Sequence, residues 1–210
     1  MIRWSILNSI FGLFYTECAF LVDPLLKVIF RGKWIDWQRE IENVLVGKRK
    51  ILEIGCGTGS LQFELAERTI QVVGLDLSSQ MLGITARKGE EVRGRAPLVR
   101  GKAENLPFRD GVFDLVFSMF PAHYILHPET IRGIRRILDS EGVFICLPWV
   151  RMRPKTLYSF FQHLIYGKGD PPPVSQLVSL ARMENFDTTV RTVVDNDGNV
   201  SFFLFCSLTS

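Results

Sequence analysis

Apolar positions between residues 48 and 150 fall into short continuous runs separated by amphipathic segments. Short apolar runs are typical of buried strands, and apolar residues three or four apart are typical of helices that cover a sheet. Buried strands are predicted at Lys50–Ile54, Gln71–Leu75, Pro97–Arg100, Phe113–Phe120 and Val143–Trp149. Helices are predicted over Ser60–Arg68, from Ser78 or Ser79 to Lys88, and from Pro128 through Ile131, Ile134 and Leu138. This alternation predicts an α/β fold with a mostly parallel sheet and helices on both faces.

The pattern changes after residue 150. Two helices are predicted first, an aromatic one over Lys155–Tyr166 and another over Val174–Asn185. Two strands follow, Thr188–Val194 and Ser201–Leu208, and Asp197-Gly198 between them favours the positive-φ turn that joins antiparallel neighbours. The parallel sheet is therefore expected to end in an antiparallel hairpin.

The first 22 residues form an apolar segment that needs a separate interpretation. Thirteen uncharged residues lie between Arg3 and Glu17, fewer than the roughly 18 that span a bilayer. Polar residues recur there at helical spacing and leave one broad apolar face. The segment is predicted to be a helix that either covers the core or a pocket, or lies on a membrane surface. Asp23-Pro24 breaks it, and a second helix is predicted to run to about Val46.

Composition narrows the class of protein. The chain has 210 residues, 47% of them hydrophobic and 22% charged, which is typical of one globular domain. A net charge of +3 is too small to indicate nucleic-acid binding. The four cysteines form no CxxC pair, and the three histidines form no HExxH-like cluster. We therefore expect reduced thiols in a cytoplasmic protein and no metal site.

The stretch "ILEIGCGTGS" (51–60) carries the first candidate chemistry. The strand brings Glu53 to its carboxyl end, where ligands bind in open α/β sheets. Gly55, Gly57 and Gly59 then let the backbone turn sharply beside a ligand. Their G-x-G-x-G spacing differs from the G-x-G-x-x-G of dinucleotide-binding proteins, which disfavours a nicotinamide-dependent enzyme. Asp76, 21 residues after Gly55, can accept hydrogen bonds from both hydroxyls of a ribose, or can simply cap the next helix.

Four segments in this order resemble the successive motifs of class I S-adenosylmethionine-dependent methyltransferases, in the branch of the ubiquinone/menaquinone C-methyltransferases. They are "ILEIGCGTGSLQFELA" (51–66), "VVGLDLSSQML" (72–82), "GKAENLPFRDGVFDLVFSMF" (101–120) and "IRRILDSEGVFIC" (134–146). The resemblance covers about half the chain, residues 48–150. It implies a Rossmann-like sheet whose last strand is antiparallel. It also implies one methyltransferase domain over residues 1–210, with helical caps at 1–47 and 151–186, a core at 48–150 and the hairpin at 187–210.

The resemblance assigns the cofactor S-adenosyl-L-methionine to this site. Gly55, Cys56, Gly57 and Gly59 would pass close to its methionine part, with Glu53 influencing the ammonium group. Asp76 would hold the ribose hydroxyls, Leu77 and Met81 would flank the adenine, and Ser118 and Met119 would lie beside the sulfonium.

One position departs from the family pattern. The family has an aspartate that approaches the adenine amino group where this chain has Lys102, and the backbone of the next residue, Ala103, would read the ring. Lysine has only donors. Glu104 or a backbone carbonyl would then substitute, or the adenine would be held by packing.

The segment "SMFPAHYILHPE" (118–129) carries the candidates for chemistry on the acceptor. Histidine is the side chain that ordinarily titrates near physiological pH, so His123 is the candidate base, with lining of the pocket or no contact as alternatives. Tyr124 is expected to orient the substrate. We predict in-line methyl transfer to a small-molecule or lipid-like acceptor, or alternatively a non-catalytic module or partner subunit that binds the cofactor. Peripheral membrane contact through the N-terminal helix stays open, and no nucleic-acid partner is expected.

Overall fold

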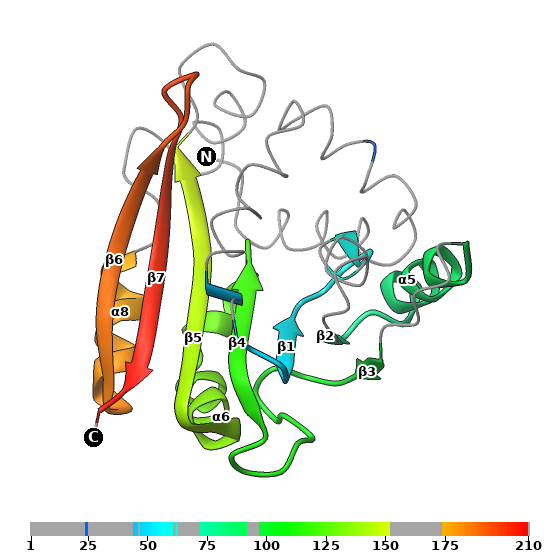
Figure 1. Ribbon diagram of the computed structural model, residues 1–210, viewed down its shortest axis with the longest axis horizontal. Helices are drawn as coiled ribbons and strands as arrows, with labels where there is room; N and C mark the ends of the chain where they lie inside the picture. Colours follow the sequence, from blue (N-terminus) through cyan, green and yellow to red (C-terminus); the bar gives the residue numbers. More distant parts are fainter. Residues whose placement is uncertain are drawn as a thin grey trace, which may run out of the picture.

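The computed structural model describes residues 44–60 except 46, residue 62, residues 72–91, 97–151 and 174–209, and Pro24. Its centre is one seven-stranded sheet with the order β3-β2-β1-β4-β5-β7-β6 (Figure 1). The strands are β1 (Ile51–Ile54), β2 (Val72–Asp76), β3 (Leu98–Arg100), β4 (Phe113–Met119), β5 (Leu138–Arg151), β6 (Phe186–Val194) and β7 (Val200–Leu208). The predicted α/β fold class is confirmed.

Strands β1 to β5 pair in parallel, and β7 pairs antiparallel with both β5 and β6. The hairpin turn is the predicted one, because Gly198 adopts a φ of +77° in the loop between β6 and β7. Parallel strands covered on both faces are apolar throughout. That is why β1 and β4 read as nearly continuous apolar runs and are buried along almost their whole length.

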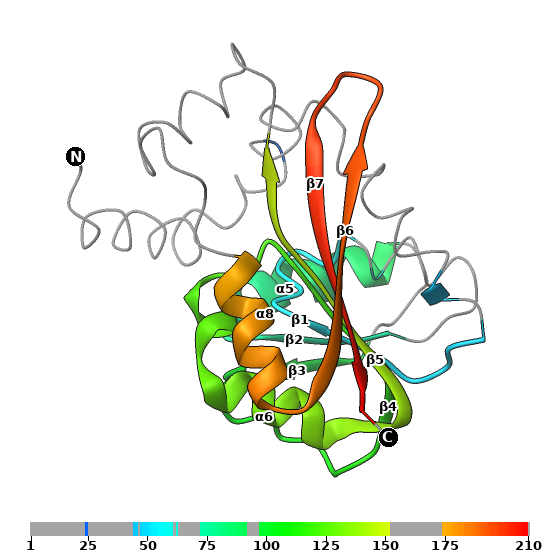
Figure 2. The ribbon, with the colours of Figure 1, turned by 90° about the vertical axis from the view of Figure 1, so that its left-hand side faces the viewer.

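Helices and sheet enclose two apolar clusters. The described helices include α5 (Ser79–Glu91), α6 (Pro128–Ile137), α8 (Val174–Met183) and the 3₁₀ helix η2 (His123–Leu126). Helices α6 and α8 lie together against one face of the sheet (Figure 2), where Ile131, Ile134 and Leu177 join the larger cluster. The smaller cluster gathers Ile51, Leu115, Phe117 and Phe203. The central strands β1 and β4 are therefore buried on both faces, as the sequence pattern predicts, whereas the edge strand β6 is largely exposed.

The predicted boundary between α6 and β5 was wrong. Leu138, expected on the helix, is the first residue of β5 and pairs with Phe113. From this pair to the next, Leu115/Val143, β4 moves on by two residues and β5 by five. The extra residues of β5 form a bulge, so the sequence "DSEG" lies within the strand and not before it. Gly142 allows this bulge, because a β-carbon there would lie 2.9 Å from side-chain atoms of Leu138.

Helix α8 ends at Met183, two residues before the predicted end. Asn185 has a φ of +59°, a left-handed conformation that asparagine tolerates better than most residues. The chain therefore leaves the helix at this point and enters β6 directly.

Several predicted elements lie outside the described residues. They are the N-terminal helix, most of the second helix, most of Ser60–Arg68, and Lys155–Tyr166. Within the described residues, no helix is both long and apolar enough to cross a bilayer.

Candidate functional site

The chain leaves β1 through a turn that crosses the carboxyl end of β2. The backbone N–H groups of Gly55 and Cys56 both donate to the carbonyl oxygen of Leu75, at 2.7 and 3.1 Å. Gly55, Gly57 and Gly59 have φ angles of +76°, +53° and +76°. This left-handed region favours glycine, so the glycine spacing of the sequence is a direct requirement of the turn.

Asp76 holds this turn to the start of the next helix. Its Oδ2 accepts a hydrogen bond from the N–H of Gly57 at 2.9 Å, and its Oδ1 accepts one from the N–H of Ser78 at 2.8 Å. The side chain is only 8% exposed. The N–H of Leu77 also acts on this carboxylate. A carboxylate has roughly four acceptor positions, so some acceptor capacity is left for a ligand with neighbouring hydroxyl groups. The helix cap is supplied instead by Ser78, whose Oγ accepts from the N–H of Met81 at 3.2 Å.

Helix α5 fixes the far side of the turn. The hydroxyl of Thr85 donates to the carbonyl oxygen of Gly57 at 2.8 Å, and the ammonium of Lys88 donates to that of Thr58 at 3.0 Å. Sequence reasoning did not identify Thr85 or Lys88. Their spacing of three residues places both on one side of the helix, but only the packing of α5 shows that this side meets the turn.

The underside of the turn is close-packed. A β-carbon at Gly74 would collide with the amide of Gln62 and would lie 2.9 Å from the Sγ of Cys56. Burial raises the pKa of the Cys56 thiol far above its ordinary value, and the charges of Glu53 and Asp76 add to the effect. Cys56 is therefore a neutral packing residue of the turn rather than a nucleophile.

Glu53 is the most unusual polar group of the site. It is 5% exposed, and its Oε2 has no hydrogen-bond partner among the described residues. Burial raises the pKa of this carboxyl well above its ordinary value of 4.5, and the neighbouring Asp76 raises it further. Burial also raises the pKa of Asp76, although its hydrogen bonds from backbone N–H groups oppose that shift. An unpartnered buried carboxyl is costly, and a cationic ligand would relieve the cost.

The segment after β4 closes the other side of the turn. The Tyr124 hydroxyl donates to the carbonyl oxygen of Ile54 at 3.1 Å and lies 2.9 Å from the Oγ of Ser118. Ser118 is buried and donates to the same carbonyl oxygen at 2.8 Å. The predicted residues Ser118 and Tyr124 are thus brought together at the end of β1.

Two further residues of this segment stand out. Phe120 has a φ of +48°, a left-handed conformation that is rare for a bulky side chain and tends to occur at functional sites. His123 begins η2 and is exposed, whereas Met119 just before the segment is buried. The strained backbone after β4 was not predicted, because the sequence there carries no glycine to signal it.

The loop after β3 borders Asp76. The N–H of Gly101 donates to the carbonyl oxygen of Asp76 at 3.1 Å. Ala103 is buried, while Lys102 and Glu104 are exposed. On the other side, Leu77 is 57% exposed, an unusual state for a leucine, but Met81 is fully buried in α5. The predicted contact of Met81 with a ligand ring stays a prediction.

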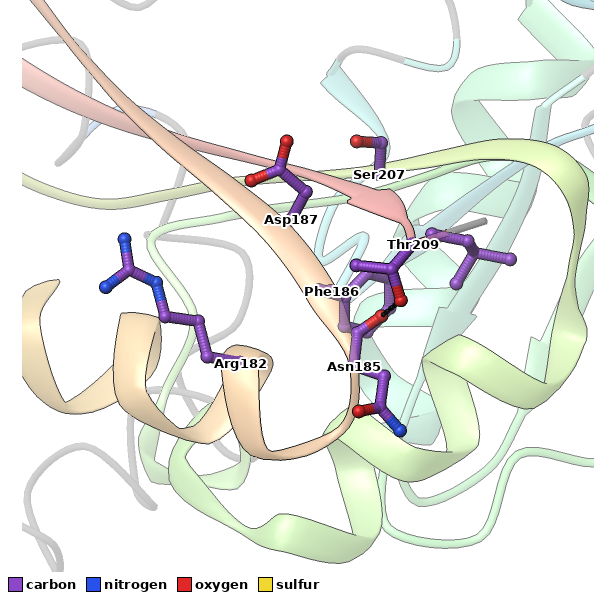
Figure 3. A pocket seen from close by; sticks show the side chains of 7 residues that line it. Arg182, Asn185, Phe186, Asp187, Ser207 and Thr209 are labelled. Carbon is purple, nitrogen blue, oxygen red and sulfur yellow. Dashed lines mark hydrogen bonds between the residues drawn. The ribbon is translucent and has the colours of Figure 1, made fainter.

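The described residues show no cluster of three or more histidine, cysteine, aspartate or glutamate side chains that could hold a metal ion. They do show a shallow groove elsewhere, lined by Arg182, Asn185, Asp187 and Thr209 among others (Figure 3). Ser207 on this groove pairs with Val143, near the amino end of the parallel part of β5. The groove therefore lies at the opposite end of the sheet from the glycine turn.

Comparisons with known proteins agree with this geometry. Residues 52–146 match the family described as "Methyltransferase domain". The chain is 32% identical to a demethylmenaquinone methyltransferase of Staphylococcus saprophyticus over 161 residues, which cover 70% of this chain and 67% of the relative. It is 34% identical to a malonyl-[acyl-carrier protein] O-methyltransferase of Legionella pneumophila over 119 residues, which cover 55% of this chain but only 40% of the relative.

Among solved structures, a SAM-dependent methyltransferase of Thermotoga maritima superposes with a TM-score of 0.65 at 19% identity. The superposition covers 91% of this chain and 97% of that protein. At this identity the likeness establishes the fold.

Proposed function

We propose that this chain, which belongs to the class I S-adenosylmethionine-dependent methyltransferases, catalyses methyl transfer to a small-molecule or lipid-like acceptor. The observation that carries the proposal is the pair of buried carboxyls, Glu53 and Asp76, at the carboxyl ends of the adjacent strands β1 and β2. The glycine turn that follows β1 lies at the same edge, with Gly55 and Gly57 half-buried beside these carboxyls.

The residues present fit the family's cofactor, S-adenosylmethionine. Asp76 retains acceptor capacity for the two ribose hydroxyls beside the bonds it makes to Gly57 and Ser78. The unpartnered Oε2 of Glu53 suits the cationic ammonium of the methionine part. Leu77, 57% exposed, offers an apolar surface for the adenine next to Asp76. In place of the family's aspartate, the exposed Lys102 leaves adenine recognition to packing and to backbone groups of the loop after β3.

S-adenosylmethionine supplies, when bound, a methyl group activated by a positively charged sulfur. The chain's own task is to hold a nucleophile in the correct direction and to remove a proton where the acceptor carries one. His123 is our candidate base because it is exposed at the start of η2, where an acceptor can reach it. Tyr124 holds η2 against the end of β1 through its hydroxyl, so we propose that it positions His123 and the acceptor.

The names of the relatives support the acceptor class. One is named for demethylmenaquinone, an isoprenoid quinone, and the other for a malonyl group on an acyl carrier protein. The quinone is a long, largely apolar molecule, whereas the malonyl group is short and charged. We propose an acceptor of the first kind, with Phe120 and the strained backbone after β4 bordering its reactive end.

Two measurements on the full chain test the proposal. Calorimetric titration with S-adenosylhomocysteine should show binding, and incubation with labelled S-adenosylmethionine should methylate a quinol with an unsubstituted ring carbon, with a malonyl thioester and an amine offered in parallel. Labelling of the quinol is the expected result. Binding without any labelling would favour a non-catalytic module, and absence of binding would overturn the proposal altogether.

Contact with a membrane surface through the N-terminal segment is a separate proposal. Flotation of the full chain with anionic liposomes, compared with a form that lacks residues 1–22, tests it. We expect only the full chain to float, and a full chain that does not float contradicts the proposal.

A further inference from the structure

The two edges of the sheet differ in how they meet a neighbouring strand. The edge strand β3 has three residues, whereas the opposite edge strand β6 has nine and pairs with β7 without any register shift. Natural edge strands are usually short, bulged, interrupted by proline, or protected by charged side chains, lysine above all. The sequence of β6, "FDTTVRTVV", has no proline, lysine or bulge and is rich in β-branched residues, and its two charged residues, Asp187 and Arg191, are of opposite sign. As far as the described part of the chain goes, this edge is therefore available to another strand.

The hydrogen bonds of the hairpin show which backbone groups point outward. Asp195 donates its N–H to the carbonyl oxygen of Asn199 at 3.0 Å, and Thr209 donates to that of Asn185 at 3.3 Å. Bonded pairs alternate along an antiparallel ladder, so the odd-numbered residues of β6 bond to β7. The N–H and C=O groups of the even-numbered residues, from Phe186 to Val194, point to the outer edge. No strand among the described residues pairs with them.

The side chains of this edge are self-complementary. Asp187 and Arg191 are both exposed and lie four residues apart, hence on the same face of β6. Thr188 bonds to Arg182 of α8, so Asp187 and Arg191 lie on the face away from α8, as Figure 3 shows for Asp187. Arg191 extends over the ring of Phe205 on this same face, 4.5 Å from its centroid.

We infer that β6 pairs antiparallel with β6 of a second copy of this chain, about a twofold axis at Thr189. This register places Asp187 opposite the partner's Arg191, and Arg191 opposite the partner's Asp187. It also pairs Thr188 with the partner's Val190, and Phe186 with the partner's Thr192. All of these residues are even-numbered, so their outward N–H and C=O groups can form hydrogen bonds across the interface. Shifting the register by two residues in either direction loses both opposite-charge pairs, and like or unmatched charges across strands are less stable. The two sheets would form one continuous sheet with a closed, twofold interface.

A charge-swap cycle tests the pairing, with the mass in solution measured by analytical ultracentrifugation of the full chain. The wild type is expected to form a dimer. Arg191→Asp turns two attractions into two repulsions and should weaken the dimer at least about tenfold, as should Asp187→Arg. The double variant Asp187→Arg/Arg191→Asp should restore the wild-type dissociation constant, because both pairs return with their signs exchanged. Arg109→Asp, an exposed charge reversal far from β6 in the sequence, is the control and should leave the dimer unchanged.

Cysteine cross-linking tests the register. Cys56, Cys146 and Cys206 are buried, so a Cys18→Ser background leaves the introduced thiol as the reactive one. Thr189→Cys should give a disulfide-linked dimer on oxidation, because residues facing each other at the axis of such a pair are about 4.5 Å apart at Cα, within disulfide range. Thr192→Cys, equally exposed but distant from the axis, should not cross-link.

The inference is overturned by a wild type that is monomeric at all concentrations tested. It is also overturned by a double variant that stays as weak as the single ones, or by cross-linking at Val190→Cys in place of Thr189→Cys. Each variant's thermal unfolding and binding of S-adenosylhomocysteine show whether the fold is retained.

Discussion

The hydroxyl of Tyr124 lies where the β-carbon of any larger residue at position 55 would be placed. The same hydroxyl donates to the carbonyl oxygen of Ile54, the residue before the turn. Glycine is thus required at position 55 for two reasons. Its φ of +76° disfavours residues with a β-carbon, and the Tyr124 hydroxyl leaves no space for one. The glycine turn and the segment after β4 form one packed unit.

Gly55→Ala should therefore destabilise the chain through two separable effects. The left-handed backbone costs about 1–2 kcal/mol for a residue with a β-carbon, and the contact with Tyr124 adds to this. In a Tyr124→Phe background the hydroxyl is gone, and the next ring atom lies 3.4 Å from the added carbon, so only the backbone cost is expected. Unfolding by denaturant measures all four proteins of this cycle.

Gly57→Ala is the matched control. Its φ is +53° and no atom lies within 4 Å of an added β-carbon. It should cost about 1–2 kcal/mol whether or not Tyr124 carries its hydroxyl. If Tyr124→Phe changes the stability cost of Gly55→Ala and of Gly57→Ala by the same amount, the Tyr124 hydroxyl does not pack specifically on Gly55.

Asp76→Asn should weaken binding of S-adenosylhomocysteine about tenfold or more, because the amide keeps one good acceptor where the carboxylate has two oxygens. The backbone N–H groups of Gly57 and Ser78 compete for that acceptor with the ribose. Calorimetric titration measures the affinity.

Ser78→Ala separates binding from stability in this region. It removes the helix cap on Met81 and should cost about 1 kcal/mol of stability while leaving the affinity for S-adenosylhomocysteine unchanged. If Asp76→Asn binds S-adenosylhomocysteine as tightly as the wild type does, Asp76 does not bind the ribose.

The raised pKa of Glu53 predicts a pH dependence of stability in the ligand-free chain. Between the ordinary value of 4.5 and the higher pKa of the folded state, the folded chain binds more protons than the unfolded one. The free energy of unfolding should therefore fall as the pH rises through this window, and the loss persists above it. Glu53→Gln should abolish that part of the dependence and make the ligand-free chain more stable than the wild type at neutral pH.

The control for this experiment is Glu104→Gln, which changes an exposed carboxyl near the same site. Its stability profile should follow that of the wild type. A Glu53→Gln variant that unfolds more easily at neutral pH would show that the carboxylate is satisfied in the ligand-free chain.

His123→Ala should lower kcat while the affinity for S-adenosylhomocysteine is retained, because the side chain is exposed at the start of η2 and the hydrogen bonds from Tyr124 and Ser118 to the end of β1 remain. Tyr124→Phe should instead lower stability by about 1 kcal/mol and affect kcat less. The kcat of both variants, measured across pH with the acceptor that the proposed assay labels, distinguishes the role of His123 from that of Tyr124. An unchanged kcat in His123→Ala would exclude it as the base.

Several parts of the fold could be predicted because they depend on local patterns. Short apolar runs predicted the parallel strands, and the Asp197-Gly198 turn predicted the hairpin. Glu53 and Asp76 lie close together because they stand at the carboxyl ends of adjacent parallel strands. The boundary at Leu138 could not be predicted, because a leucine after a helical face suits either element. Pairing with Phe113 in the neighbouring strand decides it.

The sequence by itself determined the order of strands and helices, the position of the glycine turn and the two acidic strand ends. These follow from residue types at fixed short spacing. The tertiary structure alone decided that Tyr124 closes the turn over a separation of 70 residues, that Thr85 and Lys88 hold its carbonyl groups, and that β6 ends the sheet. Such contacts depend on which faces of distant elements meet, and that is set by packing and strand register rather than by any local pattern.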